Sequence, residues 1–326
     1  MENWKNCEIN KEKLKRNQIN QKSRTRAGAF LTRKLATWMK LTCILNFLQV
    51  FYISVTMGND SSKHSGGSHG KSGASGVINS LKSGPSSSVV QKHLETAKKS
   101  RVLQLKGSNM KTVPNVIVER FQVAPLIRNL DLSQNRIPTL PSFFGQFEIL
   151  KQLHLNDNLL TSLPDELGNL KKLEVLNLSG NQLRTLPDTL VGCLALTNLN
   201  LSGNQFTSFP VVVCLLPRID IVDISKNEIQ ELPDEINQIP VSELNLNHNK
   251  LTSLNPGLAS AKKLRILRLE SNQLPKKAFT KELLENPQLC LIEFSNNHFQ
   301  QKDFQDLEGY EKYEERYTAN RRKGVY

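Results

Sequence analysis

The sequence predicts an α/β solenoid, in which short parallel strands stack side by side along one curved axis. Two observations predict it. A six-residue pattern of alternating apolar residues that ends in asparagine recurs eight times, with 22 to 25 residues between successive asparagines. Alternation of this kind forms a short strand with its leucines on one side. A unit of this length cannot bury its leucines alone, so we expect the core to form only between stacked neighbours.

The eight copies differ little in sequence. They read LDLSQN, LHLNDN, LNLSGN (twice), VDISKN, LNLNHN, LRLESN and IEFSNN, and end at Asn135, Asn158, Asn181, Asn204, Asn227, Asn249, Asn272 and Asn297. An earlier, degenerate copy, LQLKGS, has Ser108 at the asparagine position, which makes about nine units. We expect each asparagine to hydrogen-bond backbone groups where the chain turns, rather than to bind a ligand. The Leu-Pro pairs predict turns on the convex side; they are Leu140-Pro141, Leu163-Pro164, Leu186-Pro187 and Leu232-Pro233.

Each unit resembles the leucine-rich repeat, L-x-x-L-x-L-x-x-N-x-L followed by x-x-L-P. The resemblance covers residues 91 to about 308, as in LTSLPDELGNLKKLEVLNLSGNQL. It implies a curved horseshoe of about nine 23-residue repeats whose parallel strands line the concave side. The same units look like those of intracellular Ras-pathway scaffolds, an analogy at the level of the fold that names no partner.

The two ends of the repeat region predict helical caps. Val90, Leu94 and Ala97 share one helical face before the first unit, and tyrosines follow the last unit at helical spacing in LEGYEKYEERYTANRRK. Secreted leucine-rich repeat proteins typically close their ends with cysteine clusters. The cysteines here are scattered along the chain, at Cys7, Cys43, Cys193, Cys214 and Cys290. We therefore expect caps without disulfides and a reducing compartment.

Composition divides the chain into five segments. They are a basic leader with a short apolar run (1–56), a myristoylation-like start with a Gly/Ser linker (57–88), an N-terminal cap (89–101), the repeats (102–308), and a C-terminal cap with a basic tail (309–326). The formal net charge is +13, of which the leader carries +8 and residues 91–326 only +3. Nucleic-acid binding needs a basic face on the fold itself, so this distribution argues against it.

The segment MGNDSSK at residues 57–63 has the pattern Met-Gly-x-x-x-Ser of an amino-terminal myristoylation signal. From Met57 onward the chain also resembles a family of small intracellular leucine-rich repeat proteins, in MGN, HLETAKKSRVLQLKG, VSELNLNHN and LEGYEKYEERYTANRRK. That resemblance implies translation from Met57, myristate on Gly58 and a hydroxyl at Ser62. Two alternatives stay open. The motif is an accident of the linker, or the run LTCILNFLQVFYISV (41–55) acts as an export signal or anchor.

The sequence offers no reaction chemistry. SGGSHGKS (65–72) has Ser65 where a phosphate-binding loop has its first glycine, and no predicted strand precedes it. The six histidines have no partners at metal-ligand spacing, and no nucleophile constellation is visible. We expect no enzyme activity, no cofactor or metal, and no small-molecule substrate.

The outward positions of the strands are the expected binding surface, since solenoids use their concave face for recognition. The partner-binding candidates are His154, Val175, Ile221, Asp223, Ile266, Arg268, Leu291 and Glu293. The apolar members predict a stripe that contacts a protein. The alternative is that neighbouring long side chains cover them.

These observations favour a cytoplasmic, non-enzymatic scaffold that is reversibly attached to membranes. A single myristoyl chain binds membranes only marginally, so a second signal is needed. Basic residues can supply it; they are Lys63, Lys71, Lys82, Lys92, Lys98, Lys99 and Arg101. The alternative function is an exported or membrane-anchored recognition protein that uses residues 39–56 as signal or anchor and enters the secretory pathway. Its glycosylation candidates are Asn59, Asn177 and Asn200.

Overall fold

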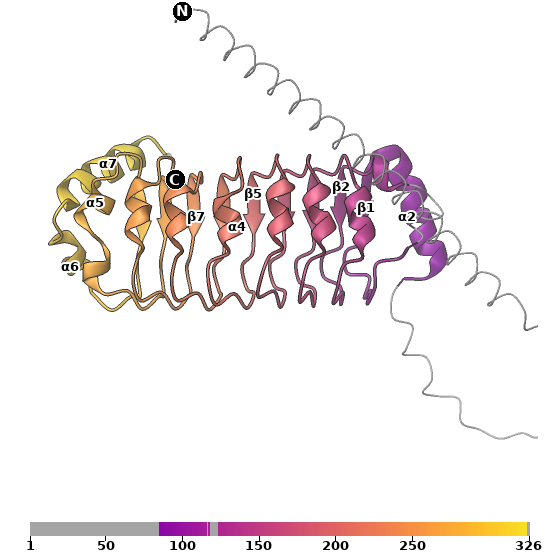
Figure 1. Cartoon of the computed structure of the whole chain (residues 1–326), viewed down its shortest axis with the longest axis horizontal. Helices are drawn as coiled ribbons and strands as arrows, with labels where there is room; N and C mark the ends of the chain where they lie inside the picture. The colour runs from indigo at the N-terminus through magenta and orange to yellow at the C-terminus, as the bar shows by residue number, and fades with distance from the viewer. Residues whose placement is uncertain (1–84, 116, 118–122, 325–326) are drawn as a thin grey trace, which may run out of the picture. The chain divides into compact units, whose positions relative to one another are not determined.

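The computed structural model describes residues 85–115, 117 and 123–324 (Figure 1). Nine strands pair in parallel, in chain order, as one open sheet. Their bounds are β1 Val102–Gln104, β2 Asn129–Asp131, β3 Gln152–His154, β4 Val175–Asn177, β5 Asn198–Asn200, β6 Ile221–Asp223, β7 Glu243–Asn245, β8 Ile266–Arg268 and β9 Leu291–Glu293. The register places equivalent residues of successive repeats opposite one another, as with Leu153, Leu176 and Leu199. The predicted α/β solenoid is confirmed.

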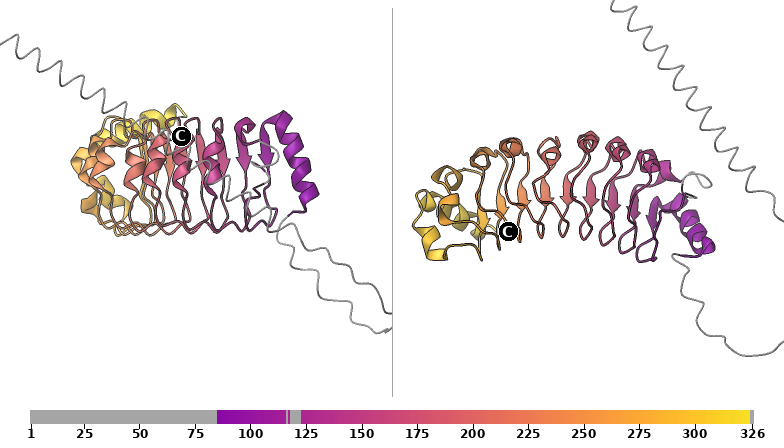
Figure 2. Two further views of the ribbon diagram at one scale, coloured as in Figure 1. Left: turned by 45° about the vertical axis from the view of Figure 1, so that its right-hand side comes forward. Right: turned by 60° about the horizontal axis from the view of Figure 1, so that its bottom comes forward.

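Short helices follow the strands on the other side of the solenoid (Figure 2). They are η1 Ala124–Leu126, η2 Ser142–Gln146, η3 Asp165–Asn169, η4 Asp188–Gly192, α4 Val211–Cys214, η5 Asp234–Gln238, η6 Pro256–Ser260, η7 Lys276–Ala278 and α5 Lys281–Leu284. The prolines of the four Leu-Pro pairs stand immediately before η2, η3, η4 and η5 in extended backbone. Proline has no N–H to contribute to a strand ladder, which explains why it is tolerated at these convex turns.

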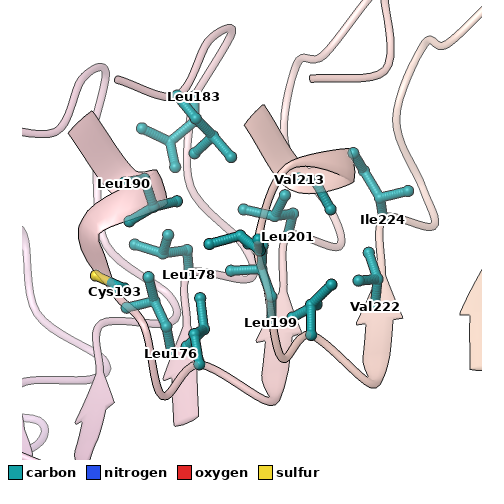
Figure 3. Packing of buried hydrophobic residues seen from close by; sticks show 14 of the residues in the cluster. Leu176, Leu178, Leu183, Leu190, Cys193, Leu199, Leu201, Val213, Val222 and Ile224 are labelled. Carbon is teal, nitrogen blue, oxygen red and sulfur yellow. The ribbon is translucent and has the colours of Figure 1, made fainter. Parts of the chain in front are cut away.

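The core lies between the sheet and the helices and continues through every repeat. In Figure 3, Leu176 and Leu178 from β4 and its continuation meet Leu199 and Leu201 from the next repeat, while Leu190 descends from η4. All five leucines are buried. Truncation of one of them to alanine removes contacts to its own repeat and to its neighbours, at a cost of roughly 2–5 kcal/mol.

The asparagines at the ends of the strand segments form a buried ladder. The Nδ2 of Asn181 donates to the carbonyl oxygens of Leu155 and Leu178 at 3.0 and 2.9 Å, and its Oδ1 accepts from the N–H of Leu160 at 3.0 Å. Asn158 and Asn204 make the same set of bonds one repeat away. The prediction that this column is structural is confirmed.

The residue before each ladder position adopts a left-handed backbone. Gly180 and Gly203 have φ near 64° there, while Gln134 and Lys226 reach φ 55° with a side chain attached. L-residues with a Cβ pay a steric cost in this region. The repeat therefore imposes one turn geometry at every unit, whether or not the sequence supplies glycine.

Helices close both ends of the sheet. At the N-terminal end, α2 Ser87–Ser100 buries Val90, Leu94 and Ala97. At the C-terminal end, α6 Gln301–Gln305 and α7 Tyr310–Arg322 follow β9. The hydroxyl of Tyr313 accepts a hydrogen bond from the N–H of Ile292 in β9 at 3.0 Å, so α7 satisfies part of the edge strand. The three cysteines within the described residues are free thiols.

Candidate interaction surface on the strand face

The first and third residues of every strand point away from the core and form a surface that we call the strand face. The middle residue of each strand is buried, whereas the flanking residues are partly or fully exposed. Because the strands are in register, these flanking residues form two columns that run along the solenoid. All eight predicted partner-binding residues lie in these columns, on strands β3, β4, β6, β8 and β9.

Several side chains in the column of third residues hydrogen-bond the backbone of the turn that follows the strand. The Oδ1 atoms of Asn177 and Asn200 accept hydrogen bonds from the N–H and the hydroxyl of the serine two residues later. Asp223 accepts from the N–H of Ser225 at 3.0 Å. This turn fixes the end of the strand segment, as Asn and Asp side chains commonly do. Asp223 therefore has a structural task besides any contact with a partner.

Four of the predicted residues surround one depression, which we call the central hollow. His154, Val175, Ile221 and Asp223 line it, and its volume is about 320 Å³. Ile221 is 36% exposed. Val175 is half-buried, as are Ile266 and Leu291 further along the same column. The neighbouring side chains thus cover three of the four apolar residues in part and leave Ile221 open.

Arg268 forms ion pairs with strands on both of its sides. Its guanidinium pairs with Glu243 of β7 and, at 3.0 Å through Nε, with Glu293 of β9. The three side chains remain between about a quarter and a third exposed. Sequence reasoning predicted Arg268 and Glu293 as neighbours in one column that contacts a partner, and the structure pairs them with each other. One guanidinium between two carboxylates leaves this cluster with a net charge of −1.

A second depression, the terminal hollow, lies where β9 meets α6 and α7, and its volume is about 500 Å³. Leu291 and Glu293 connect it to the strand face, and most of its remaining lining comes from residues beyond the last strand. The hydroxyl of Tyr310 donates to Glu314 at 2.8 Å. Burial, reinforced by that carboxylate, raises the pKa of Tyr310 above its usual range.

Sequence reasoning named Asp223 and Glu293 but missed Glu243, Glu270, Glu314 and the phenylalanines that shape these hollows. Glu243 stands in the first column, opposite Ile266, and its ion pair with Arg268 in the third column runs diagonally across the register, which the repeat pattern does not indicate. Glu270 and Glu314 belong to a turn and to α7, and only the fold brings them to one hollow. Phe294 and Phe299 occupy leucine positions of the last repeat, where the pattern indicates core residues, and Phe304 follows in α6.

Other predicted groups lie outside the described residues. These are the lipidation candidate Gly58, the neighbouring Ser62, the linker lysines Lys63, Lys71 and Lys82, the apolar run 41–55, and the start site Met57. Within residues 85–115, 117 and 123–324, no helix is both long and apolar enough to cross a membrane. In the same part of the chain, no group of three or more His, Cys, Asp or Glu side chains is arranged to hold a metal ion.

The repeats, the open parallel sheet and the strand face together define a leucine-rich repeat solenoid. A family model described as leucine rich repeat matches residues 148–206, which span the repeats around β3, β4 and β5. The fold of the described residues is therefore that of a leucine-rich repeat solenoid.

Solved structures of the same class resemble this chain. A leucine-rich repeat protein of Leptospira interrogans, LIC12759, is 27% identical with a TM-score of 0.57; the match covers 67% of this chain and 62% of that one. The leucine-rich repeat domain of APL1B is 27% identical with a TM-score of 0.53, covering 68% and 66%. A chain of the LRIM1/APL1C complex is 28% identical with a TM-score of 0.52, covering 63% and 38%. This chain thus spans less than two thirds of the length of each.

Proposed function

We propose that this chain is a non-enzymatic scaffold that binds a protein partner on its strand face. The observation that carries the proposal is the apolar side chains in the first column, with Ile221 open above the central hollow. The fold does not require apolar residues there, because Asn129, Gln152 and Asn198 occupy equivalent positions. Burial of apolar area against a partner is favourable at about 25 cal/mol per Å².

The mixture of apolar and polar groups favours a protein over a small molecule as the partner. Small-molecule sites enclose most of their ligand in a concave and mainly apolar pocket. The central hollow is shallow by comparison, and Asn177, Asn200 and Asn245 contribute amides to its lining. One of the similar structures is that of a complex, LRIM1/APL1C, so a chain of this fold occurs there in an assembly. That assembly supports the proposal as an analogy at the level of the fold.

The test is to place charges on the stripe and to measure partner capture. Val175→Asp with Ile221→Asp puts two carboxylates at the central hollow, and we expect cross-linking and capture of endogenous protein partners to fall at least tenfold. The matched control is Val191→Asp with Leu194→Asp, which alters two apolar residues on the helix side that are 41% and 51% exposed. Retention of every partner by the folded strand-face variant would overturn the proposal.

We propose further that myristate on Gly58 tethers the scaffold to anionic membrane surfaces. The motif at residues 57–63 supports it, together with the resemblance of residues 57–326 to a small intracellular family. The basic residues at the end of α2 supply the second signal. Lys92, Lys99 and Arg101 are exposed there. Arg128 lies beside Arg101 because its N–H donates to the carbonyl oxygen of Arg101 at 2.8 Å.

The mass of the amino terminus of the endogenous protein tests the tether. We expect a myristoylated Gly58, and we expect Gly58→Ala to release a Met57-initiated product from the membrane fraction. An unchanged membrane fraction would contradict the proposal. Cleavage near Thr56, with glycans on Asn177 and Asn200, would instead support export. Both asparagines line the central hollow, so glycans there would cover the surface proposed to bind the partner.

A further inference from the structure

The terminal hollow has aromatic walls that are partly open to solvent. Phe304 and Tyr313 are buried, whereas Phe294, Phe299 and Tyr310 are half-buried. The rings form one connected cluster. Phe294 stacks on Phe304 at 4.1 Å between centroids, and Phe299 stacks on Phe294 at 5.5 Å. These contacts fix the rings in place, so the wall exists before any ligand arrives.

Carboxylates line the same hollow. Glu270, Glu293 and Glu314 belong to its lining, which contains no lysine or arginine among the described residues. Glu293 already shares Arg268 with Glu243. Glu270 and Glu314 have no ion-pair partner within the part of the chain that the structure describes. Glu314 instead accepts hydrogen bonds from Tyr310 and Thr318, and Glu270 accepts one from the amide of Asn247 at 3.5 Å. The hollow and its adjoining ion pairs therefore carry a net charge of −3.

This combination identifies the chemistry of the occupant. The face of an aromatic ring attracts a cation within about 6 Å of its centroid. A guanidinium is planar, so it can stack on a ring while its N–H groups donate to carboxylates, and it is less strongly hydrated than an ammonium. An anionic group would face uncompensated carboxylates. An apolar group would remove water from Glu270 and Glu314 without supplying a cation to balance their charge.

We propose that the terminal hollow binds an arginine side chain of the protein partner that occupies the strand face. The inference rests on the proposed scaffold function and adds the chemistry of one contact. Leu291 and Glu293 belong to both the strand face and the hollow, so a peptide that follows the first column reaches the hollow without a change of direction. The arginine head group lies between the Phe294 and Phe299 rings and the carboxylates of Glu270 and Glu314.

The test is a titration of the full chain with acetyl-Gly-Arg-Gly-Arg-Gly amide, followed by NMR of the backbone amides. The matched probe replaces both arginines by citrulline, which keeps the shape and removes the charge. We expect the shifts to concentrate at residues 291–299 and 310–317. The citrulline peptide should bind at least tenfold more weakly, and higher salt should weaken the arginine peptide.

Two double variants distinguish binding at the terminal hollow from attraction of the peptide to surface carboxylates in general. Glu270→Gln with Glu314→Gln keeps the size and hydrogen-bonding oxygen of both side chains, and should weaken arginine-peptide binding at least tenfold. Glu148→Gln with Glu231→Gln removes two exposed carboxylates outside the hollow and should leave binding unchanged. Equal binding of the two peptides would overturn the proposal, as would equal effects of the two variants.

The outcome is independent of the stripe test. Val175→Asp with Ile221→Asp should leave arginine-peptide binding intact, because neither residue lines the terminal hollow. Loss of partner capture with intact peptide binding supports both proposals. Peptide binding only by a Met57-initiated chain, and not by the 1–326 chain, would make the basic leader the occupant and overturn the assignment to a partner.

Discussion

At the scale of single residues, asparagines at two positions of the repeat have two different structural roles. The ladder asparagine Asn181 is buried and bonds four backbone groups, while Asn177 on the strand face is half-exposed and fixes a local turn. The repeat pattern distinguishes these two columns because their positions differ by four residues within each unit. Sequence alone therefore separates structural from surface asparagines here.

The ladder predicts a large effect for one amide. Asn181→Ala leaves the buried N–H of Leu160 without its acceptor, whereas the carbonyl oxygens of Leu155 and Leu178 still accept from the amides of Asn158 and Asn204. An unsatisfied buried group costs about 1–3 kcal/mol, so we expect urea unfolding to show a loss of roughly that size. Asn129→Ala, on the half-buried strand face, is the control and should cost less than about 1 kcal/mol. Equal losses would contradict the ladder's role.

The buried thiols predict a dependence on alkaline pH. Burial raises the pKa of Cys193 from 9.0 to about 12, and burial together with Glu235 does the same for Cys214. Because the folded pKa lies above the unfolded one, stability from the neutral thiols is complete below pH 9 and is lost as pH rises towards 12. Each thiol contributes a slope of at most about 1.4 kcal/mol per pH unit.

Urea unfolding at pH 8 and pH 10.5 checks this expectation. The wild-type chain should lose up to about 4 kcal/mol more between the two values than Cys193→Ala with Cys214→Ala. The cavity left by the alanines lowers stability at both pH values and cancels from the comparison. Parallel losses in the two proteins would show that the thiols do not titrate on unfolding.

At the scale of elements, the C-terminal cap stabilises the last repeat by hydrogen bonds to its backbone as well as by packing. Arg316 donates to the carbonyl oxygens of Leu284 and Leu289, and Tyr313 accepts from Ile292. The tyrosine spacing predicted a helical lid from sequence. The pairing of its hydroxyl with a strand N–H could not be predicted, because it depends on how α7 crosses the last repeat.

The hydroxyl of Tyr313 can be removed without loss of the ring. Tyr313→Phe leaves the buried N–H of Ile292 without this acceptor, and we expect the free energy of unfolding to fall by about 1–3 kcal/mol. Hydrogen exchange at Ile292 should accelerate. Tyr310→Phe is the control, because its hydroxyl bonds a half-exposed glutamate, and it should cost less than about 1 kcal/mol. Unchanged exchange at Ile292 would rule out the edge contact.

The site was less predictable from sequence than the fold. Repeat spacing determines which residues share a column, so Val175, Ile221 and Ile266 were placed correctly on the strand face. Their exposure depends on the length and direction of neighbouring side chains, which the pattern does not contain. The terminal hollow combines a turn residue, the last strand and α7, and no local sequence motif brings Glu270 to Glu314.

At the scale of the whole molecule, charge is unevenly distributed between the ends of the solenoid. Basic residues at α2 and the first repeats contrast with the carboxylates of the terminal hollow. If the amino-terminal end contacts an anionic membrane, its basic residues each add up to about 1 kcal/mol of binding. The strand face and the terminal hollow are then available to a partner from the aqueous side.

Charge reversal at α2 tests this orientation. Lys92→Glu, Lys99→Glu and Arg101→Glu should weaken binding of the myristoylated protein to phosphatidylserine vesicles on the order of a hundredfold, and the difference should shrink at high salt. The control reverses Lys262, Lys263 and Arg265, three exposed basic residues between η6 and β8. Sedimentation of vesicles measures both. Equal weakening by the two sets would show that net charge alone matters.

The parallel register of the nine strands has a consequence for assembly. Each strand presents the same backbone donors and acceptors to the next strand, so an uncovered edge strand could pair with a further strand in the same way. At the β1 edge the hydroxyl of Ser100 hydrogen-bonds the N–H and the carbonyl oxygen of Val102. At the β9 edge the hydroxyl of Tyr313 accepts a hydrogen bond from the N–H of Ile292. The terminal helices thus cover both edges of the sheet. A chain that lost α7 would present a template on which another copy can continue the lattice, and fibres rather than unfolded monomers are the expected product.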